Sequence, residues 1–221
     1  MKKIFDMKNP VFRFMGNVFD LIYLNFLYLV ASLPIATMGA ALSSLHHVTY
    51  KILKGQEPSI SKVFIQSFKQ NWKQGTVLFL TLILPLLIVT CDIAFLIFSE
   101  DIADLLVVQL LKIVLGAVCF LILCTAVSVF TVQAIFENSV RNHIKNALLL
   151  SLRNLPKTVF ILLFQCAYWM LALWSIFSCP TLTLFFLIFG AALPVNFSMR
   201  VLLPELKQFM PVQSANEATE G

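Results

Sequence analysis

Charged residues are scarce in this sequence. Asp, Glu, Lys and Arg make up 12% of its 221 residues, whereas 59% are hydrophobic and the mean hydropathy is +0.88. A soluble globular domain typically has about 25% charged and about 45–50% apolar residues. The composition therefore excludes an ordinary water-soluble enzyme. It also argues against nucleic-acid binding, although a net charge of +5 would by itself suit it.

Catalytic and metal-binding motifs are missing as well. His46 and His47 are adjacent, so their side chains point about 100° apart on a helix, and His143 lies far along the chain. None of the five cysteines belongs to a Cys-x-x-Cys pair, which excludes a typical zinc site. The sequence also lacks a Gly-x-Ser-x-Gly elbow, a phosphate-binding loop and a dinucleotide fingerprint. We therefore expect a protein that is not an enzyme and that binds neither a metal nor a cofactor.

What the chain does contain is long uncharged runs, at residues 21–50, 74–91, 113–136 and 158–199. About 20 apolar residues cross a hydrocarbon core of about 30 Å. The last run is long enough for two crossings and has a turn signal at Ser178-Cys179-Pro180. The sequence thus predicts an all-α polytopic membrane protein with four transmembrane helices, at 76–98, 105–133, 159–177 and 181–199.

The first run predicts a fifth, broken segment. It is too long for one straight span, Pro34 lies near its middle, and Thr37 and Gly39 follow. Proline removes a backbone donor and kinks a helix, and backbone groups freed in lipid need partners inside the protein. Two interpretations stay open: a hairpin that re-enters, or a single crossing that places the basic N-terminus outside. If a solute path exists, Thr37 and the backbone around Pro34 are its best candidates.

Basic residues gather on one side of this topology. If the four spans alternate, eleven Lys and Arg lie in residues 43–73, 137–157 and the C-terminal segment, and none lies in the two opposite loops. Cytoplasmic loops carry such an excess. We expect a multi-pass protein of the bacterial inner membrane with a cytoplasmic C-terminus. Residues 1–207 would form one integral membrane domain, and residues 208–221 a disordered polar tail.

Two of these basic segments predict amphipathic helices, which we call the elbow helices. Apolar residues recur every fourth position from Ile60 to Trp72 and at similar spacing from Val140 to Leu155. Such helices either lie in the membrane interface or dock on another molecule, and both interpretations stay open. The docking interpretation rests on the basic residues of the opposite faces, Lys62, Lys69, Lys73, Arg141, Lys145 and Arg153.

Polar residues inside the predicted spans are candidate functional residues. Asp92 and Lys112 each lie ten residues from Ile102, at the tip of a predicted helical hairpin, so we predict an intramembrane ion pair between them. Other polar residues of the spans more often join helices by hydrogen bonds than line a solute path. These are Asn25, Thr125, Ser128, Thr131 and Gln165.

Short stretches of the chain resemble the YesL-like bacterial integral membrane proteins, a family of unknown function. They are Asn25, the LPIATMGAAL run at 33–42, the SFKQNWKQ run at 67–74, and the stretch from Asn146-Ala147-Leu148 to Leu155-Pro156-Lys157-Thr158. The resemblance implies a five-segment helical membrane protein, often encoded near carbohydrate uptake systems, with no established activity and no catalytic residues.

From the basic elbows and this resemblance we expect a non-enzymatic accessory or regulatory component associated with a solute uptake system, of the carbohydrate class. Its expected partners are the lipid bilayer and a membrane subunit of that system. The alternative is a small secondary transporter acting as a homo-oligomer, indicated by the broken first segment and by Asp92.

The predicted ion pair can be tested by exchanging its charges. Asp92→Lys or Lys112→Asp alone leaves two like charges in the membrane and should reduce the yield of membrane-inserted protein. The double exchange restores an opposite-charge pair and should recover the yield, measured by quantitative blotting of membranes. A double variant as poor as the single ones would show that the two residues do not pair.

Overall fold

The computed structural model describes residues 10–56, 59–99 and 105–208, and every regular element within these ranges is a helix. The elements are α1 (Pro10–Ser32), η1 (Ile35–Thr37), α2 (Met38–Leu53), α3 (Ile60–Phe98), α4 (Leu106–Ile135), α5 (Val140–Arg153), α6 (Leu155–Ser178), α7 (Pro180–Phe189) and α8 (Ala192–Lys207). By length and composition α1, α3, α4 and α6 suffice to cross a membrane, and the bent pair α7–α8 would supply a fifth span. The predicted all-α polytopic class is confirmed.

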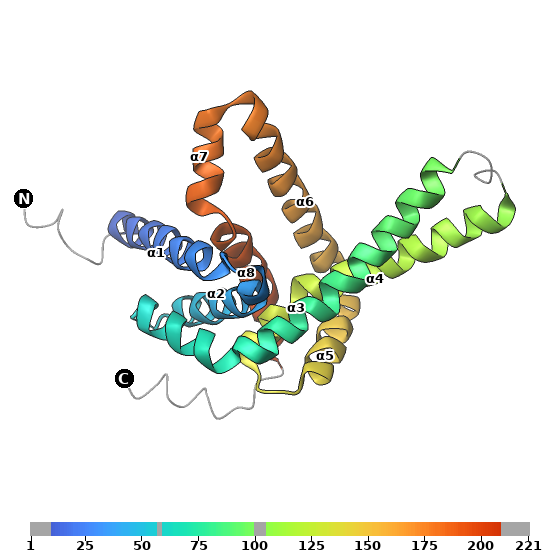
Figure 1. The fold of residues 1–221 in the computed structure, drawn as a ribbon. Helices are drawn as coiled ribbons and strands as arrows, with labels where there is room; N and C mark the ends of the chain where they lie inside the picture. Colours follow the sequence, from blue (N-terminus) through green and yellow to red (C-terminus); the bar gives the residue numbers. More distant parts are fainter. Residues whose placement is uncertain (1–9, 57–58, 100–104, 209–221) are drawn as a thin grey trace, which may run out of the picture.

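Two long hairpins diverge from a common base (Figure 1). One is formed by α3 and α4 and the other by α6 and α7, and α8 lies at the centre of the base between them. The buried apolar residues gather in this base. Leu78, Phe130 and Leu202 belong to one cluster, and Leu24 and Leu45 to another. The outer halves of the hairpins carry mostly exposed apolar side chains, as expected for surfaces in contact with lipid.

The break in the first hydrophobic run lies where Pro34 predicts it. Helix α1 ends at Ser32, the short η1 turn follows, and α2 begins at Met38. The two parts are unequal, because α1 begins at Pro10, ahead of the uncharged run, and is long enough to span alone. Helix α2 turns back beside α1 (Figure 1).

The last predicted span, 181–199, is not one straight helix. Helix α7 ends at Phe189, α8 begins at Ala192, and their axes differ by 53°. Gly190 lies at the break with φ of +31°, a value that residues with a β-carbon rarely adopt. Hydropathy does not predict this break, because Gly190 and Ala191 lie inside an uncharged, apolar run.

Both elbow helices are present, and each buries small and polar residues beside apolar ones. In the first, the start of the continuous helix α3, Phe64 of the predicted apolar face is buried together with Ser67 and Gly75, while Trp72 is 49% exposed. The second is α5, which buries His143 and Ser151. Small and polar residues face inward because they permit close approach to another helix. Large apolar residues can remain on a surface in contact with lipid.

Helices α2 and α3 cross at two glycines. A β-carbon added to Gly39 would overlap the carbonyl oxygen of Gly75, and one on Gly75 would lie 2.9 Å from the carbonyl oxygen of Gly39. The backbones are thus in direct contact, as in small-residue helix crossings in membranes. The Thr76 hydroxyl donates to the carbonyl of Ala36 at 3.0 Å, which ties the turn before α2 to α3.

Replacing Gly39 by alanine should therefore push α2 and α3 apart. Overpacking of this kind costs about 1–3 kcal/mol, so we expect a clearly lower thermal unfolding temperature in detergent. Gly116→Ala is the matched control, because Gly116 is also helical and has no neighbour within 4 Å of an added β-carbon. Equal unfolding temperatures for the two variants would contradict the crossing.

Candidate functional site

Asn25 joins α1 to the break between α7 and α8. Its side-chain amide donates to the carbonyls of Leu187 (2.9 Å) and Ile188 (3.0 Å), and its Oδ1 accepts from the backbone N–H of Ala191 (3.0 Å). The side chain is 1% exposed. A β-carbon on residue 190 would overlap the Asn25 amide, so the glycine there also permits this approach. Asn25 therefore satisfies the backbone groups that the break exposes.

The break between α1 and α2 is satisfied in a similar way. The hydroxyl of Thr37 donates to the carbonyls of Ala31 and Pro34, both at 2.8 Å. Thr37 was a candidate for lining a solute path, whereas in the structure its hydroxyl closes the turn. Gly39 lies in the α2–α3 crossing. The residues of the predicted broken segment therefore make their contacts within the protein.

The predicted polar stripe of α4 is buried and faces two other helices. The Ser128 hydroxyl lies 2.7 Å from that of Ser151 on α5, which also donates to the Cys124 carbonyl at 2.7 Å. Thr131 Oγ1 lies 3.3 Å from Nδ1 of His46 on α2. The hydroxyl of Thr125 donates to the carbonyl one turn back in α4 itself. The stripe thus joins α4 to α5 and to α2.

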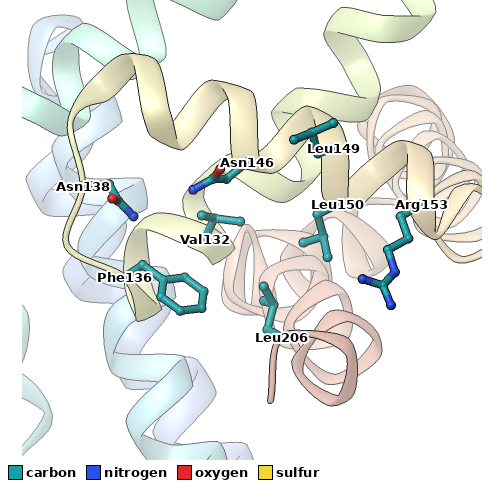
Figure 2. A pocket seen from close by; sticks show the side chains of 8 residues that line it. All are labelled: Val132, Phe136, Asn138, Asn146, Leu149, Leu150, Arg153 and Leu206. Atoms are coloured by element: carbon teal, nitrogen blue, oxygen red, sulfur yellow. The ribbon is translucent and has the colours of Figure 1, made fainter. Parts of the chain in front are cut away.

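Beside α5 lies a cavity of about 380 Å³ between this helix, the end of α4 and the end of α8 (Figure 2). Figure 2 shows Asn138 and Asn146 at one end of the cavity and Arg153 at the other. The remaining lining residues are apolar: Val132, Phe136, Leu149, Leu150 and Leu206. The volume falls within the usual range of about 300–1,000 Å³ for small-molecule and side-chain pockets.

Three of the basic residues predicted for docking lie on α5, which lines the cavity, and the other three lie on the first part of α3. All of them are exposed, namely Lys62, Lys69, Lys73, Arg141, Lys145 and Arg153. The Gln74 side chain on α3 donates to the Asn138 carbonyl at 2.5 Å, which connects the two elbow helices at their base. The cavity itself was not predicted, because Asn138, Asn146 and Leu206 carry no sequence signal that would bring them together.

The charged residues predicted to pair are on neighbouring helices but form no ion pair in the described ranges. Asp92 on α3 is exposed and Lys112 on α4 is half-buried. The ion pair that the described residues do form joins Lys157 to Glu205, and so links α6 to α8. The pairing of Asp92 with Lys112 stays a prediction.

Buried polar atoms without a partner lie near the base of α4 and α5. Within residues 10–56, 59–99 and 105–208 these are both amide atoms of Gln133 and Nδ1 of His143. Burial lowers the pKa of His143, and a hydrogen bond to the backbone of Asn138 opposes part of this effect. Across the same described ranges no three His, Cys, Asp or Glu side chains come together as metal ligands would.

Part of the chain matches a known protein family. Residues 21–93 match a family described as "Protein of unknown function, DUF624". The matched segment covers about a third of the chain and includes the second half of α1, the break, α2 and most of α3. It supports a likeness to an uncharacterised family of membrane-protein type. No curated protein and no solved structure matches the chain significantly.

Removing the Asn25 amide should destabilise the protein. Asn25→Leu has similar volume but leaves the backbone groups of the α7–α8 break without partners, and a buried unsatisfied group costs about 1–3 kcal/mol. We expect a marked loss of thermal stability in detergent. Asn142→Leu is the matched control, since Asn142 is an exposed amide on α5. A loss of the same size in both variants would refute the role of Asn25.

The buried His143 should make stability depend on pH. Its pKa is lower in the folded protein than in the unfolded chain. Below about pH 6.5 the unfolded chain therefore binds a proton that the folded protein does not, and stability falls by up to about 1.4 kcal/mol per pH unit. His143→Gln should flatten this dependence between pH 6.5 and 5, measured as thermal unfolding at each pH. An unchanged slope would contradict the assignment.

Proposed function

We propose that this protein is a non-enzymatic accessory component of the bacterial inner membrane that docks on a membrane subunit of a solute uptake system. In this proposal the elbow helices and the C-terminus face the cytoplasm. The carbohydrate class of the uptake system rests on the resemblance to YesL-like proteins. The observation that carries the docking role is the exposed basic surface of α5 beside the cavity of Figure 2.

This surface combines two features of protein interfaces. Arg141 and Lys145 are exposed on α5, and exposed charges set the orientation and rate of association. The adjoining cavity has walls formed by Phe136, Leu150 and Leu206, and a buried anchor side chain in such a pocket supplies most of the binding energy of an interface. A partner loop with acidic residues around one large apolar side chain would fit both features.

The arrangement of the hairpins supports a partner as well. Their outer halves diverge (Figure 1), and their exposed side chains are largely apolar, among them Phe95 and Leu106 on one hairpin and Trp174 and Leu184 on the other. Within the described residues, the two hairpins therefore do not form a closed bundle around a central path. This arrangement suits a protein that associates with another membrane protein better than one that moves a solute alone.

Affinity purification in a mild detergent, followed by mass spectrometry, tests the docking role. The wild-type protein should recover a membrane subunit of an uptake system. In the Arg141→Gln/Lys145→Gln variant we expect about tenfold less of that partner, because each exposed interface charge contributes about 0.2–1 kcal/mol. The Lys62→Gln/Lys69→Gln/Lys73→Gln variant tests the first elbow helix in the same way.

The control for this experiment removes the same charge elsewhere. Lys54 and Arg200 are both exposed, lie outside the two elbow helices and do not line the cavity of Figure 2, so Lys54→Gln/Arg200→Gln should retain the partner. Equal losses in the elbow and control variants would indicate a general effect of charge. Recovery of the protein alone, with no partner, would contradict the accessory role.

A small secondary transporter acting as a homo-oligomer is the second candidate function. It is favoured by the two helix breaks, at residues 33–37 and at Gly190, since transporters often bind solutes at broken helices. We place it second because the side chains of Thr37 and Asn25 already form hydrogen bonds with the backbone carbonyls at these breaks. Those carbonyls are then less available to a solute. A partner-free homo-oligomer in the purification would favour it over docking.

A further inference from the structure

A second cavity, of about 260 Å³, lies apart from the cavity of Figure 2. It is lined by residues of α1, α2, α4, α6, α8 and by Ala191. Its walls are mostly apolar, and no Asp, Glu, Lys or Arg is among the residues that line it. Four lining residues carry polar groups: Tyr28, His46, Gln165 and Trp169. They come from three different helices, so only the fold brings them together.

These polar groups are poorly satisfied within the protein. Across residues 10–56, 59–99 and 105–208, no hydrogen bond is formed by the Tyr28 hydroxyl, the Gln165 amide or the Trp169 indole N–H. His46 is 4% exposed and uses Nδ1 toward Thr131, which leaves its other ring nitrogen available. These side chains are not buried in the protein, since Trp169 is 48% exposed and Tyr28 and Gln165 are half-buried. At membrane depth the surroundings are lipid rather than water, so a polar group there without a protein partner is costly. Their convergence on one cavity therefore points to a ligand.

The position of the cavity limits the charge of that ligand. Gln165 and Trp169 lie near the middle of α6, a helix long enough to span, and Tyr28 lies within the apolar part of α1. A charged headgroup at mid-depth would need a counter-charge, and the lining offers none. The ligand should therefore be uncharged.

The lining groups also indicate the shape and polarity of the ligand. Indole N–H is a donor only, and the hydroxyl, amide and imidazole can each donate. Trp169 and Tyr28 further offer aromatic faces for a flat ring. A planar ring with hydrogen-bond acceptors at its edge matches this set. The cavity lies against α4 and α6, whose outer parts diverge (Figure 1), so a hydrocarbon chain attached to the ring would extend into lipid.

We propose that this cavity binds the ring of an isoprenoid quinone, with the carbonyl oxygens of the ring accepting hydrogen bonds from Tyr28, Gln165 and Trp169. A quinone is uncharged and flat, presents acceptors at opposite edges, and resides in the apolar part of the membrane. The proposal concerns binding alone and is independent of the docking function, because the cavity shares no lining residue with that of Figure 2.

Tryptophan fluorescence provides a direct test, since quinones quench a nearby indole. The full chain has three tryptophans, and Trp72→Phe/Trp174→Phe leaves Trp169 as the sole tryptophan. Titration of this variant in detergent with decylubiquinone or menadione should give saturable quenching. Adding Tyr28→Phe and Gln165→Leu should weaken the apparent affinity by about tenfold, because two hydrogen bonds are lost.

The matched control keeps Trp174 in place of Trp169. Trp174 lies on the same helix and is exposed to a similar extent, 59% against 48% for Trp169, but it does not line the cavity. It should therefore report only quinone dissolved in the micelle, as quenching that does not saturate. Indistinguishable quenching of Trp169 and Trp174 would overturn the proposal.

Two further measurements distinguish a quinone site from a general lipid site and from a structural role of the polar residues. Dioctanoylglycerol, an uncharged lipid without a ring, should not displace decylubiquinone, and equal competition would overturn the assignment to quinones.

Thermal unfolding without ligand checks whether the variants keep their stability. Tyr28→Phe and Gln165→Leu remove unpaired polar groups, so stability should stay unchanged or rise while affinity falls. A parallel loss of both would show that these residues are structural and would overturn the proposal.

Discussion

The constraint on which the structure depends is the pairing of backbone groups where a helix breaks in an apolar environment. Asn25 is the main example, because one side chain binds two carbonyls at the end of α7 and the first free N–H before α8. Water is not available for this in lipid. The first helix must therefore lie against the last two, and residues more than 160 positions apart become neighbours.

The same constraint shapes the other break and the base of the protein. Thr37 closes the turn after α1, and Thr76 ties that turn to α3 one residue beyond the glycine crossing. The hydroxyls of Ser128 and Ser151 then join α4 to α5. Polar contacts thus hold the helices where they meet at the base. The hairpins beyond it have few such contacts and diverge, which leaves their apolar surfaces to lipid or to another protein.

Much of the fold could be predicted because it follows from local properties. The lack of charge in long runs indicates spans, Pro34 indicates a break, and acidic or Pro-containing segments of the sequence separate the predicted spans. The break at Gly190 could not be predicted, since it depends on Asn25 from a distant segment. On α5 the buried residues lie beside the predicted apolar stripe rather than on it. Apolar periodicity identifies the side that avoids water, whereas in a membrane the large apolar side chains are equally suited to lipid and small ones mark the helix contacts.

The candidate sites were harder to predict for a related reason. Asn25 and Gln165 look equivalent in the sequence, as single amides within apolar runs. In the structure Asn25 uses both its donor and acceptor groups in the α7–α8 break, whereas Gln165 lines a cavity with no hydrogen bond to the described residues. The difference lies in the partner, which for Asn25 is the backbone of a distant helix. A polar residue whose bonding capacity is already used by the protein supports the fold, and one whose capacity is unused at membrane depth indicates a ligand.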